Sequence, residues 1–280
     1  KRQVAVFGSG PGAARSLGLL LKGCDGEADI TKPRPPHHSG TTPVIDLCEQ
    51  EKLPYHTAKN KQELSDLFTT KTFKSPLAIL IDFGIIVNKD VIDYFPLGIL
   101  NSHFSLLPEW RGADPITFAI LSGQQMTGVS LMLLVEAMDE GPLISYGEQP
   151  LDGSETTPEL TERLILLSDA LLRHNVPLYL EHLKSAAQDI TGRKASYSRK
   201  LTKEDGVIDW QKPAEQLERE IRAFLEWPKS RTTLTGKDIV ITKAHVIDES
   251  GTPGQAAVKD KQLFVYCGKK ALGIDELIPA

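Results

Sequence analysis

The chain has 280 residues, of which 40% are hydrophobic and 25% charged, and its formal net charge is −5. It is long enough to bury a core in one large domain and one smaller domain, and its composition is that of a soluble globular protein. The acidic balance argues against binding of nucleic acid over the whole surface.

Neither the cysteines nor the apolar segments indicate secretion or membrane insertion. Cys24, Cys48 and Cys267 are far apart and form no CxxC pair, so the sequence predicts neither a disulfide framework nor a zinc site. No apolar run approaches the roughly 18 residues of a membrane span, and KRQVAVFGSG (1–10) enters a strand without the apolar core of a signal peptide. We therefore expect a cytoplasmic protein that binds no membrane.

Strand and helix patterns alternate through the first half of the chain. VAVF (4–7) is a strand pattern, and GSGPGAARSLGLLL (8–21) predicts a tight turn followed by a helix. TKPRPPHHSGTTP (31–43) contains four prolines and is predicted to be a loop. Further strands are predicted at 77–87, 97–104 and 127–135, and further helices at 44–53 and 116–123. The alternation predicts an α/β domain with a mostly parallel sheet.

The second half begins with a long helical pattern. Residues 156–186 have a threonine at a cap position, a proline suited to the first turn and apolar residues at helical spacing. We expect a long helix here, bent or broken near Pro177.

A second helix and a β-rich tail follow. KPAEQLEREIRAF (212–224) is amphipathic, with Leu217, Ile221 and Phe224 on one face. Short strand patterns separated by turn residues fill 232–277, which favours a small barrel.

The first turn also resembles half of a dinucleotide-binding fingerprint. GSGPGA (8–13) fits G-x-G-x-x-A, and Asp29 follows at about the distance of a ribose-binding acid. Asp29 is embedded in DGEADIT and does not clearly end a strand, so a plain strand-to-helix turn is favoured over NAD binding. His37 and His38 lie in a proline-rich loop without a third ligand nearby and predict no metal site.

The stretch NSHFSLLPEWRGADP (101–115) carries the strongest chemical signal. Asn101 and His103 follow a strand pattern, and Asp139 follows the next one, so adjacent strand ends are expected to direct these side chains into one crevice. An amide donor, an imidazole and an orienting carboxylate suit a reaction that passes through an oxyanion. The alternative is that Asn101 and His103 only cap a loop. Ser102 and Ser105 lack the G-x-S-x-G context of a hydrolase.

Charge is unevenly distributed along the chain. Residues 1–189 hold 16 basic and 24 acidic residues, whereas 190–280 hold 16 and 13. The stretch RKASYSRKLTK (193–203) has five basic residues and no acid, so it is either a solvated linker or a contact for phosphates.

Two long segments carry a resemblance to a known family. NSHFSLLPEWRGADPI, followed from residue 127 by TGVSLMLLVEAMDEGPLI, resembles the signature of the 10-formyltetrahydrofolate-dependent formyltransferases, Asn-x-His-x-Ser-Leu-Leu-Pro with a later Asp in a D-x-G loop. Residues 197–228 resemble the linker and C-terminal domain of the methionyl-tRNA formyltransferases. The resemblance covers most of the chain.

The resemblance implies an architecture and a reaction. It implies a Rossmann-like formyltransferase domain at 1–189, a basic linker at 190–204 and an OB-like, tRNA-binding β-barrel domain at 205–280. The implied reaction is transfer of a formyl group from 10-formyltetrahydrofolate to initiator methionyl-tRNA by a monomer that needs no metal.

The resemblance also implies the site residues. Asn101, His103 and Asp139 would be catalytic. The folate would be held by Phe83, Gly84, Ile85, Ile86, Val87, Val135, Glu136 and Met138. The tRNA would be contacted by Arg34, Arg111, Arg193, Lys194, Arg199, Lys200 and Lys203.

Three features depart from the family pattern and leave alternatives open. The first turn is one residue shorter and lacks the aromatic residue that helps form the methionine pocket, and the loop 31–43 has only Lys32 and Arg34 as basic residues. The sequence ends at IDELIPA, slightly short of the usual end, which leaves a missing tail open. A sugar-nucleotide or other small-amine N-formyltransferase and a formyltetrahydrofolate hydrolase share the signature. A non-catalytic folate- or nucleotide-binding regulator would be expected to lack one of the three polar residues.

Overall fold

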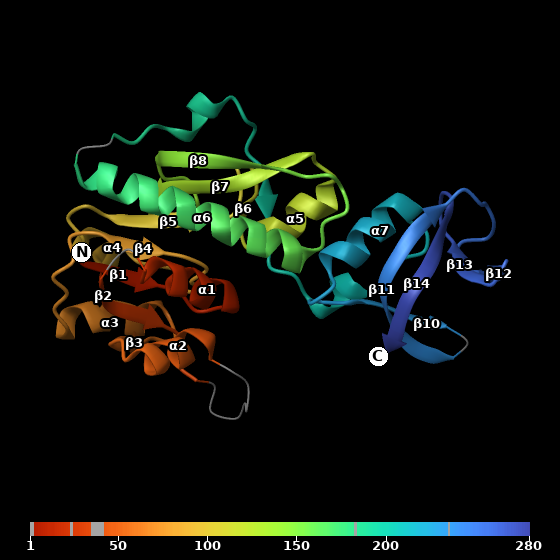
Figure 1. Cartoon of the computed structure of the whole chain (residues 1–280), viewed down its shortest axis with the longest axis horizontal. Coiled ribbons are helices and arrows are strands. Elements are labelled where there is room, and N and C mark those ends of the chain that lie inside the picture. The colour runs from red at the N-terminus through yellow and green to blue at the C-terminus, as the bar shows by residue number, and fades with distance from the viewer. Residues whose placement is uncertain (1–2, 23–24, 35–41, 182–183, 235) are drawn as a thin grey trace. The chain divides into compact units, whose positions relative to one another are not determined.

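A computed structural model describes residues 3–22, 25–34, 42–181, 184–234 and 236–280 (Figure 1). The chain forms two compact units, each made of several stretches. Unit 1 comprises Lys1–Arg111, Gly128–Gln149 and Glu162–Tyr197, and unit 2 comprises Gly112–Thr127, Pro150–Thr161 and Ser198–Ala280. These units group residues by compactness, and the domain boundaries at 189 and 204 stay a prediction.

Unit 1 is built on a seven-stranded sheet. Its strand order is β3-β2-β1-β4-β5-β7-β8. The strands are β1 (Gln3–Phe7), β2 (Asp25–Thr31), β3 (Tyr55–Thr57), β4 (Ala78–Leu80), β5 (Ile99–His103), β7 (Met126–Leu133) and β8 (Leu143–Pro150). The first five strands pair in parallel and β7 runs antiparallel to β5, so the predicted, mostly parallel sheet of a Rossmann-like domain is confirmed.

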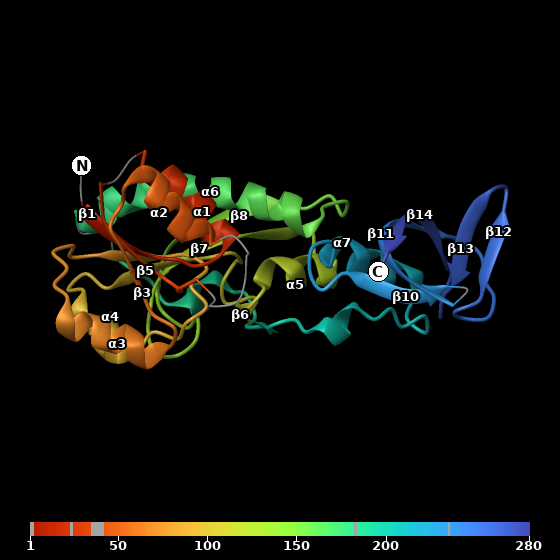
Figure 2. The ribbon, with the colours of Figure 1, turned by 90° about the horizontal axis from the view of Figure 1, so that it is seen from below.

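Helices cover both faces of this sheet. They are α1 (Pro11–Leu20), α2 (Pro43–Glu51), α3 (Lys61–Thr70), α4 (Lys89–Tyr94) and α6 (Thr157–Leu180), with a 3-10 turn η1 at Gln188–Thr191. Figure 2 shows α1, α2 and α6 on one face and α3 and α4 on the other. Successive side chains of a strand point to opposite faces. Val4 and Val6 therefore pack with α1, α2 and α6, and Ala5 and Phe7 pack with α3 and α4.

Several element boundaries differ from the expectation. The strand expected at 77–87 ends at Leu80, because Asp82 takes a left-handed conformation with φ 46° and turns the chain out of the sheet. The helix expected to bend or break near Pro177 continues through it to Leu180. The strands β2, β3 and β8 and the helix α3 were not predicted, since their sequences have weak or mixed periodicity.

The glycine turn between β1 and α1 is closely packed and lies beside a carboxylate. A Cβ at Gly8 would lie 2.7 Å from the Ala13 Cβ. A Cβ at Gly10, the N-cap of α1, would lie 2.4 Å from the Asp82 carboxylate. Ser9 donates its N–H and its hydroxyl to the Asp82 carbonyl, both at 3.1 Å. A carboxylate thus lies where a helix N-terminus would attract a pyrophosphate, which agrees with a plain turn.

Asp29, the other half of that fingerprint, is a buried strand residue. It lies inside β2, is 2% exposed, and accepts a 3.4 Å hydrogen bond from the Cys48 thiol. Its second carboxylate oxygen has no hydrogen-bond partner. Burial raises the pKa of Asp29 to about 7, although the Cys48 contact acts in the opposite direction. Burial and the nearby Asp29 carboxylate also raise the pKa of the Cys48 thiol.

We expect Asp29→Asn to abolish a loss of stability between about pH 4 and pH 7. Because the folded-state pKa of Asp29 is raised to about 7 from 3.8, the folded protein binds this proton more tightly than the unfolded chain. The wild type therefore loses stability as pH rises through that window, by about 4 kcal/mol in total. The measurement is the urea midpoint of wild type and variant at pH 5 and pH 8.

The control for this prediction is the exposed Asp93→Asn, which should leave the pH dependence of the wild type in place. If Asp29→Asn lost as much stability between the two pH values as the wild type does, Asp29 would not be the titrating group.

Unit 2 combines two helices with a five-stranded antiparallel sheet. The sheet has the order β10-β11-β14-β13-β12. Its strands are β10 (Ser230–Leu234), β11 (Lys237–Ile247), β12 (Ala256–Lys259), β13 (Gln262–Tyr266) and β14 (Ala271–Pro279). The remaining elements that lie in or reach this unit are α5 (Pro115–Ser122), α7 (Ala214–Ala223), β6 (Arg111–Gly112), β9 (Tyr197–Ser198) and the 3-10 turn η2 (Lys203–Gly206). An antiparallel sheet of this size is consistent with the small barrel-like domain that was predicted.

The core of unit 2 lies between α7 and the sheet. Leu217, Ile221 and Phe224 are 1%, 2% and 4% exposed, which confirms the predicted apolar face. Leu217 and Ile221 pack with Ile241 and Leu272 of the sheet. Within the described residues, no helix combines the length and the apolar character that a bilayer crossing needs.

Candidate active site

The site begins at β5, whose residues are all buried. The hydroxyls of Ser102 and Ser168 lie 2.6 Å apart and tie this strand to α6. Beyond His103, Ser130 of β7 accepts the Leu107 N–H at 2.9 Å and donates to the Ser105 carbonyl at 2.8 Å. These contacts hold the loop after β5 against the sheet and give Ser102 a structural role.

Asp139 reaches Asn101 and His103, but by a different route from the one expected. β5 and β7 are antiparallel, so their C-terminal ends lie at opposite edges of the sheet and not side by side. The loop after β7 instead folds back along β5. Leu134 donates its N–H to the Ile99 carbonyl at 2.8 Å, and Leu133 donates to Pro142 at 2.9 Å. The loop closes tightly, because a Cβ at Gly141 would lie 1.7 Å from the Leu133 oxygen.

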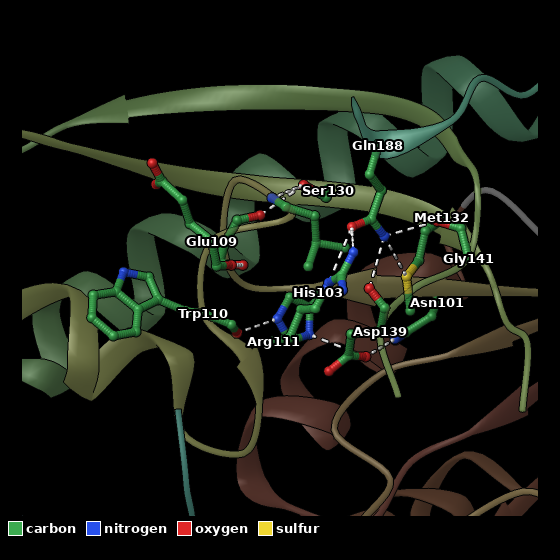
Figure 3. A network of polar contacts seen from close by, with 12 residues as sticks. Asn101, His103, Glu109, Trp110, Arg111, Ser130, Met132, Asp139, Gly141 and Gln188 are labelled. Carbon is green, nitrogen blue, oxygen red and sulfur yellow. Dashed lines mark hydrogen bonds and ion pairs between the residues drawn. The ribbon is translucent and has the colours of Figure 1, made fainter. Parts of the chain in front are cut away.

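The three polar side chains meet around one carboxylate oxygen (Figure 3). Asp139 Oδ1 lies 3.5 Å from Asn101 Nδ2 and 3.7 Å from His103 Nδ1. The His103 and Asp139 side chains are 8% and 12% exposed. His103 Nε2 lies 2.9 Å from the Trp110 carbonyl, and since a carbonyl only accepts, Nε2 carries a proton. The other imidazole nitrogen therefore faces Asp139.

This geometry leaves an amide donor and an imidazole nitrogen, which donates when the ring is protonated, available beside a carboxylate. Contacts of 3.5 and 3.7 Å lie at or beyond the end of the hydrogen-bond range, so Asp139 saturates neither Asn101 Nδ2 nor His103 Nδ1. Both groups can turn to a substrate oxygen on which negative charge develops. Asp139 can orient a protonated imidazole or accept a proton.

A glutamine far away in the sequence holds the Asp139 loop. Gln188 of η1 is 6% exposed, and its amide nitrogen donates to the carbonyls of Asp139 at 2.7 Å and Gly141 at 2.8 Å. Its amide oxygen accepts from Arg111 Nη2 at 2.8 Å. Arg111 Nη1 lies 3.2 Å from Glu140, in the same loop. Figure 3 shows Gln188 between Arg111 and the loop.

A serine holds the loop that carries Trp110. The Ser196 hydroxyl accepts the Trp110 N–H at 2.9 Å, and the Ser196 carbonyl accepts the Arg111 N–H at 2.9 Å. Ser196 also donates its own N–H to Pro108 at 3.2 Å. The sequence did not single out Gln188 or Ser196, because each lies in a polar run with no spacing that relates it to residues 101–139.

The residues predicted to bind folate lie in two loops that leave the sheet. In the loop after β4, Phe83 and Val87 are buried, whereas Ile86 is 66% exposed. In the loop after β7, Val135 and Met138 are 37% and 62% exposed. The other predicted positions here are Gly84, Ile85 and Glu136, of which Gly84 faces the Lys32 ammonium. These loops therefore present large apolar side chains to solvent.

All four arginines that were predicted to bind tRNA form ion pairs with acidic side chains. Arg34 lies 2.9 Å from Asp46 and Arg111 contacts Gln188 and Glu140. Arg193 lies 3.0 Å from Glu148 and stacks over Tyr146, and Arg199 pairs with Asp205 through both nitrogens. The pairing with Arg199 holds the pKa of the Asp205 carboxyl well below its usual range. The predicted lysines, Lys194, Lys200 and Lys203, are exposed.

The part of the chain that the structure describes contains no cluster of metal-ligating side chains. Among those residues, no three His, Cys, Asp or Glu side chains gather as metal ligands would. His37 and His38 lie outside the described residues.

Unit 2 also contains a cavity. Its volume is about 820 Å³, and it lies among α7, β11 and the residues around 151–159. Its Arg222 is held by both oxygens of Glu218 and by the Glu155 carbonyl. We place the candidate site at Asn101, His103 and Asp139, where donors remain available.

Known proteins resemble this chain along almost its whole length. Residues 34–174 match the family model described as formyl transferase, and residues 200–280 match the one described as formyl transferase, C-terminal domain. The methionyl-tRNA formyltransferase of Magnetococcus marinus is 32% identical over 98% of this chain and 90% of its own. That of Stutzerimonas stutzeri is 33% identical over 98% and 89%.

Solved structures share the fold at lower identity. An N-formyltransferase from Helicobacter canadensis, in complex with folinic acid and dTDP-3-aminofucose, has a TM-score of 0.72 and 17% identity over 99% of this chain and 100% of its own. The sugar 3N-formyltransferase WlaRD has the same TM-score and identity over 98% and 97%.

Proposed function

The chain belongs to the formyl transferase family, and from that premise we propose that it transfers the formyl group of 10-formyltetrahydrofolate to the α-amine of methionyl initiator tRNA. The observation that carries the proposal is similarity along 98% of the chain, through both family domains, to proteins that bear the name methionyl-tRNA formyltransferase. The polar set at the end of β5 supplies groups that suit this chemistry.

The proposed reaction joins the amine to the formyl carbon. The neutral methionyl amine attacks this carbon and a new nitrogen–carbon bond forms. The amine releases a proton, the bond to the donor nitrogen breaks, and that nitrogen takes up a proton as tetrahydrofolate leaves. Asn101 Nδ2 and, in the imidazolium form, His103 Nδ1 donate to the formyl oxygen while negative charge builds on it, and they bind this charge better than the uncharged ground state. Asp139 orients His103 and receives the amine proton, directly or through water.

The residues of the two loops fit the folate. Ile86, Val135 and Met138 expose apolar atoms that suit a flat pterin ring, and the backbone of 83–87 lies outside the sheet, where its polar groups can hydrogen-bond to that ring. The folate supplies the formyl group. The protein's part is to hold it beside Asn101 and His103.

The exposed lysines of the basic stretch fit a polyanion. Lys194, Lys200 and Lys203 offer charge to phosphates, whereas Arg193 and Arg199 would first have to leave Glu148 and Asp205. We place the protein in the cytoplasm as a monomer, where charged initiator tRNA and reduced folate occur.

A small-amine acceptor is the second candidate. The first turn lacks the aromatic residue of the methionine pocket, and two structures with the same fold belong to proteins described as formyltransferases that act on amino sugars or bind them. An amino-sugar nucleotide would meet the same donors at Asn101 and His103, so only the acceptor differs.

The deciding experiment compares acceptors. The protein is incubated with 10-formyltetrahydrofolate and either methionyl initiator tRNA, an amino-sugar nucleotide or no acceptor, and products are identified by mass spectrometry. We expect formylmethionyl-tRNA. If only the amino sugar were formylated, the acceptor would be a small amine and not tRNA. Rapid release of formate without an acceptor would indicate a hydrolase.

A further inference from the structure

We propose that the segment 188–196 is a clamp that positions both His103 and Asp139, with Gln188 and Ser196 as its positioning residues. The clamp rests on the proposed function, because it assigns residues that hold the catalytic pair of that reaction. Gln188 donates to the Asp139 carbonyl, and Ser196 accepts the Trp110 N–H. Each acts through the backbone of a loop.

Gln188 fixes the backbone at Asp139. This residue has φ 54°, a left-handed conformation that is uncommon outside glycine but that aspartate adopts more readily than most residues. The Gln188 amide nitrogen holds this backbone through the carbonyls of Asp139 and Gly141. Its oxygen is in turn held by Arg111, so the amide cannot rotate without breaking a charge-assisted bond.

Ser196 fixes the carbonyl that orients His103. Trp110 also has a left-handed φ of 54°, and its carbonyl accepts from His103 Nε2. Ser196 accepts the Trp110 N–H through its hydroxyl and contacts Pro108 and Arg111 through its backbone. The imidazole therefore keeps its second nitrogen turned to Asp139 only while Ser196 holds this loop.

One short segment thus carries both tethers and also the first basic residues of the stretch 193–203. Ser196 lies between Lys194 and Lys200, which are exposed. The clamp and the tRNA contact would be neighbours in sequence with separable roles. Loss of the clamp should slow turnover with any acceptor, whereas loss of the lysines should weaken only binding of tRNA.

The test uses Gln188→Leu, Gln188→Glu and Ser196→Ala in the full chain. Gln188→Leu removes every hydrogen bond of the amide, and Gln188→Glu keeps the contact to Arg111 but replaces both donations with a carboxylate oxygen. We expect kcat to fall about 10-fold in both Gln188 variants and less in Ser196→Ala, with KM for tRNA unchanged, since misplacing a reacting group by about 1 Å costs up to about 10²-fold. The fall should be equal with tRNA and with a small amine.

A second readout is independent of activity. Amide hydrogen exchange of residues 134–142 should accelerate in both Gln188 variants without any substrate, while the urea midpoint stays near that of the wild type. Gln262→Leu is the matched control, because that amide also donates to two backbone carbonyls, those of Leu263 at 2.9 Å and Ile274 at 3.0 Å, within the sheet of unit 2.

Three results would overturn the clamp: a kcat within twofold of the wild type in both Gln188 variants, unchanged exchange in 134–142, or a defect confined to KM for tRNA. If the wild type formylated no acceptor, the proposed function would fail, and the exchange experiment would still decide whether Gln188 holds the loop.

Discussion

Replacing Asn101 by alanine is expected to lower kcat by about 10²–10³-fold, the usual cost of removing one donor from an oxyanion site. Asn101 Nδ2 is 3.5 Å from Asp139 and is free to donate to the formyl oxygen, and the alanine variant leaves that charge with one donor fewer. Binding of folate should change little, because the donor acts on charge that appears only in the transition state. The measurement is kcat and KM for formyl transfer at saturating folate.

His103→Gln separates catalysis from packing at the neighbouring position. A glutamine amide nitrogen can take the place of His103 Nε2 and keep the 2.9 Å contact to the Trp110 carbonyl, but nothing replaces Nδ1, which faces Asp139. We expect a loss in kcat of the same size as for Asn101→Ala with a retained fold. His103→Ala should lose both catalysis and some stability, since the His103 contact to the carbonyl of the half-buried Trp110 would then be lost.

The control for these variants is Asn175→Ala. Asn175 is 5% exposed and donates its amide to the Leu171 carbonyl at 2.8 Å, so this change also removes a buried amide from unit 1. It should lower stability without a comparable loss of kcat. Near-normal turnover in Asn101→Ala or His103→Gln would show that the reaction occurs elsewhere.

The parts of the fold that follow local patterns were predictable, and those that depend on long-range contacts were not. The alternation of strand and helix patterns predicted the parallel sheet. The helix face that carries Leu217, Ile221 and Phe224 is buried, as the spacing of these residues indicated. In contrast, nothing local marks the end of β4, where the left-handed Asp82 turns the chain. Pro177 is tolerated inside α6, although the sequence rule favours a break.

The candidate site, too, was predictable only in the parts that follow from local sequence. Residue types and the family signature brought Asn101, His103 and Asp139 together correctly, but the assumption of adjacent strand ends was wrong because β7 is antiparallel to β5. Asp139 instead reaches the end of β5 because the loop after β7 folds back. This loop is held by Gln188, which lies 49 residues beyond Asp139 in the chain. Such a contact has no periodicity and no motif, so only the folded chain reveals it.

Replacing Lys194, Lys200 and Lys203 together by glutamine is expected to weaken binding of methionyl-tRNA by about 10²-fold at about 0.1 M salt. These three side chains are the lysines of the stretch 193–203, and all three are exposed. Each phosphate contact that is lost should lower the slope of log affinity against log salt by up to about 0.9. The measurement is tRNA affinity at several salt concentrations.

The matched control changes the same amount of charge elsewhere. Lys59, Lys61 and Lys71 are exposed residues of unit 1, and their replacement by glutamine lowers the net charge equally. If affinity depended only on net charge, both triple variants would lose the same amount. A loss confined to the stretch variant would indicate direct phosphate contacts.

The two arginines of the stretch are expected to contribute less to tRNA affinity than the three lysines. Arg199 has both nitrogens on Asp205, and Arg193 is held by Glu148 and Tyr146, so either must break an ion pair before it binds a phosphate. Replacing them should therefore cost less affinity than replacing the lysines. A larger loss from the arginines would mean that tRNA binding rearranges these pairs.

This test uses substitutions in the whole chain. A fragment that ends before the basic stretch would lose other contacts together with the lysines. Within unit 2, Arg219 of α7 donates to the Leu121 carbonyl at 3.1 Å, so removal of the C-terminal part would expose residues next to α5. It would also remove Ser196 and with it the hydrogen bond that holds Trp110. In the lysine variant the clamp stays, so kcat with a small amine should equal that of the wild type while tRNA affinity falls. Unchanged tRNA affinity and salt slope would make the stretch a solvated linker and favour the small-amine acceptor.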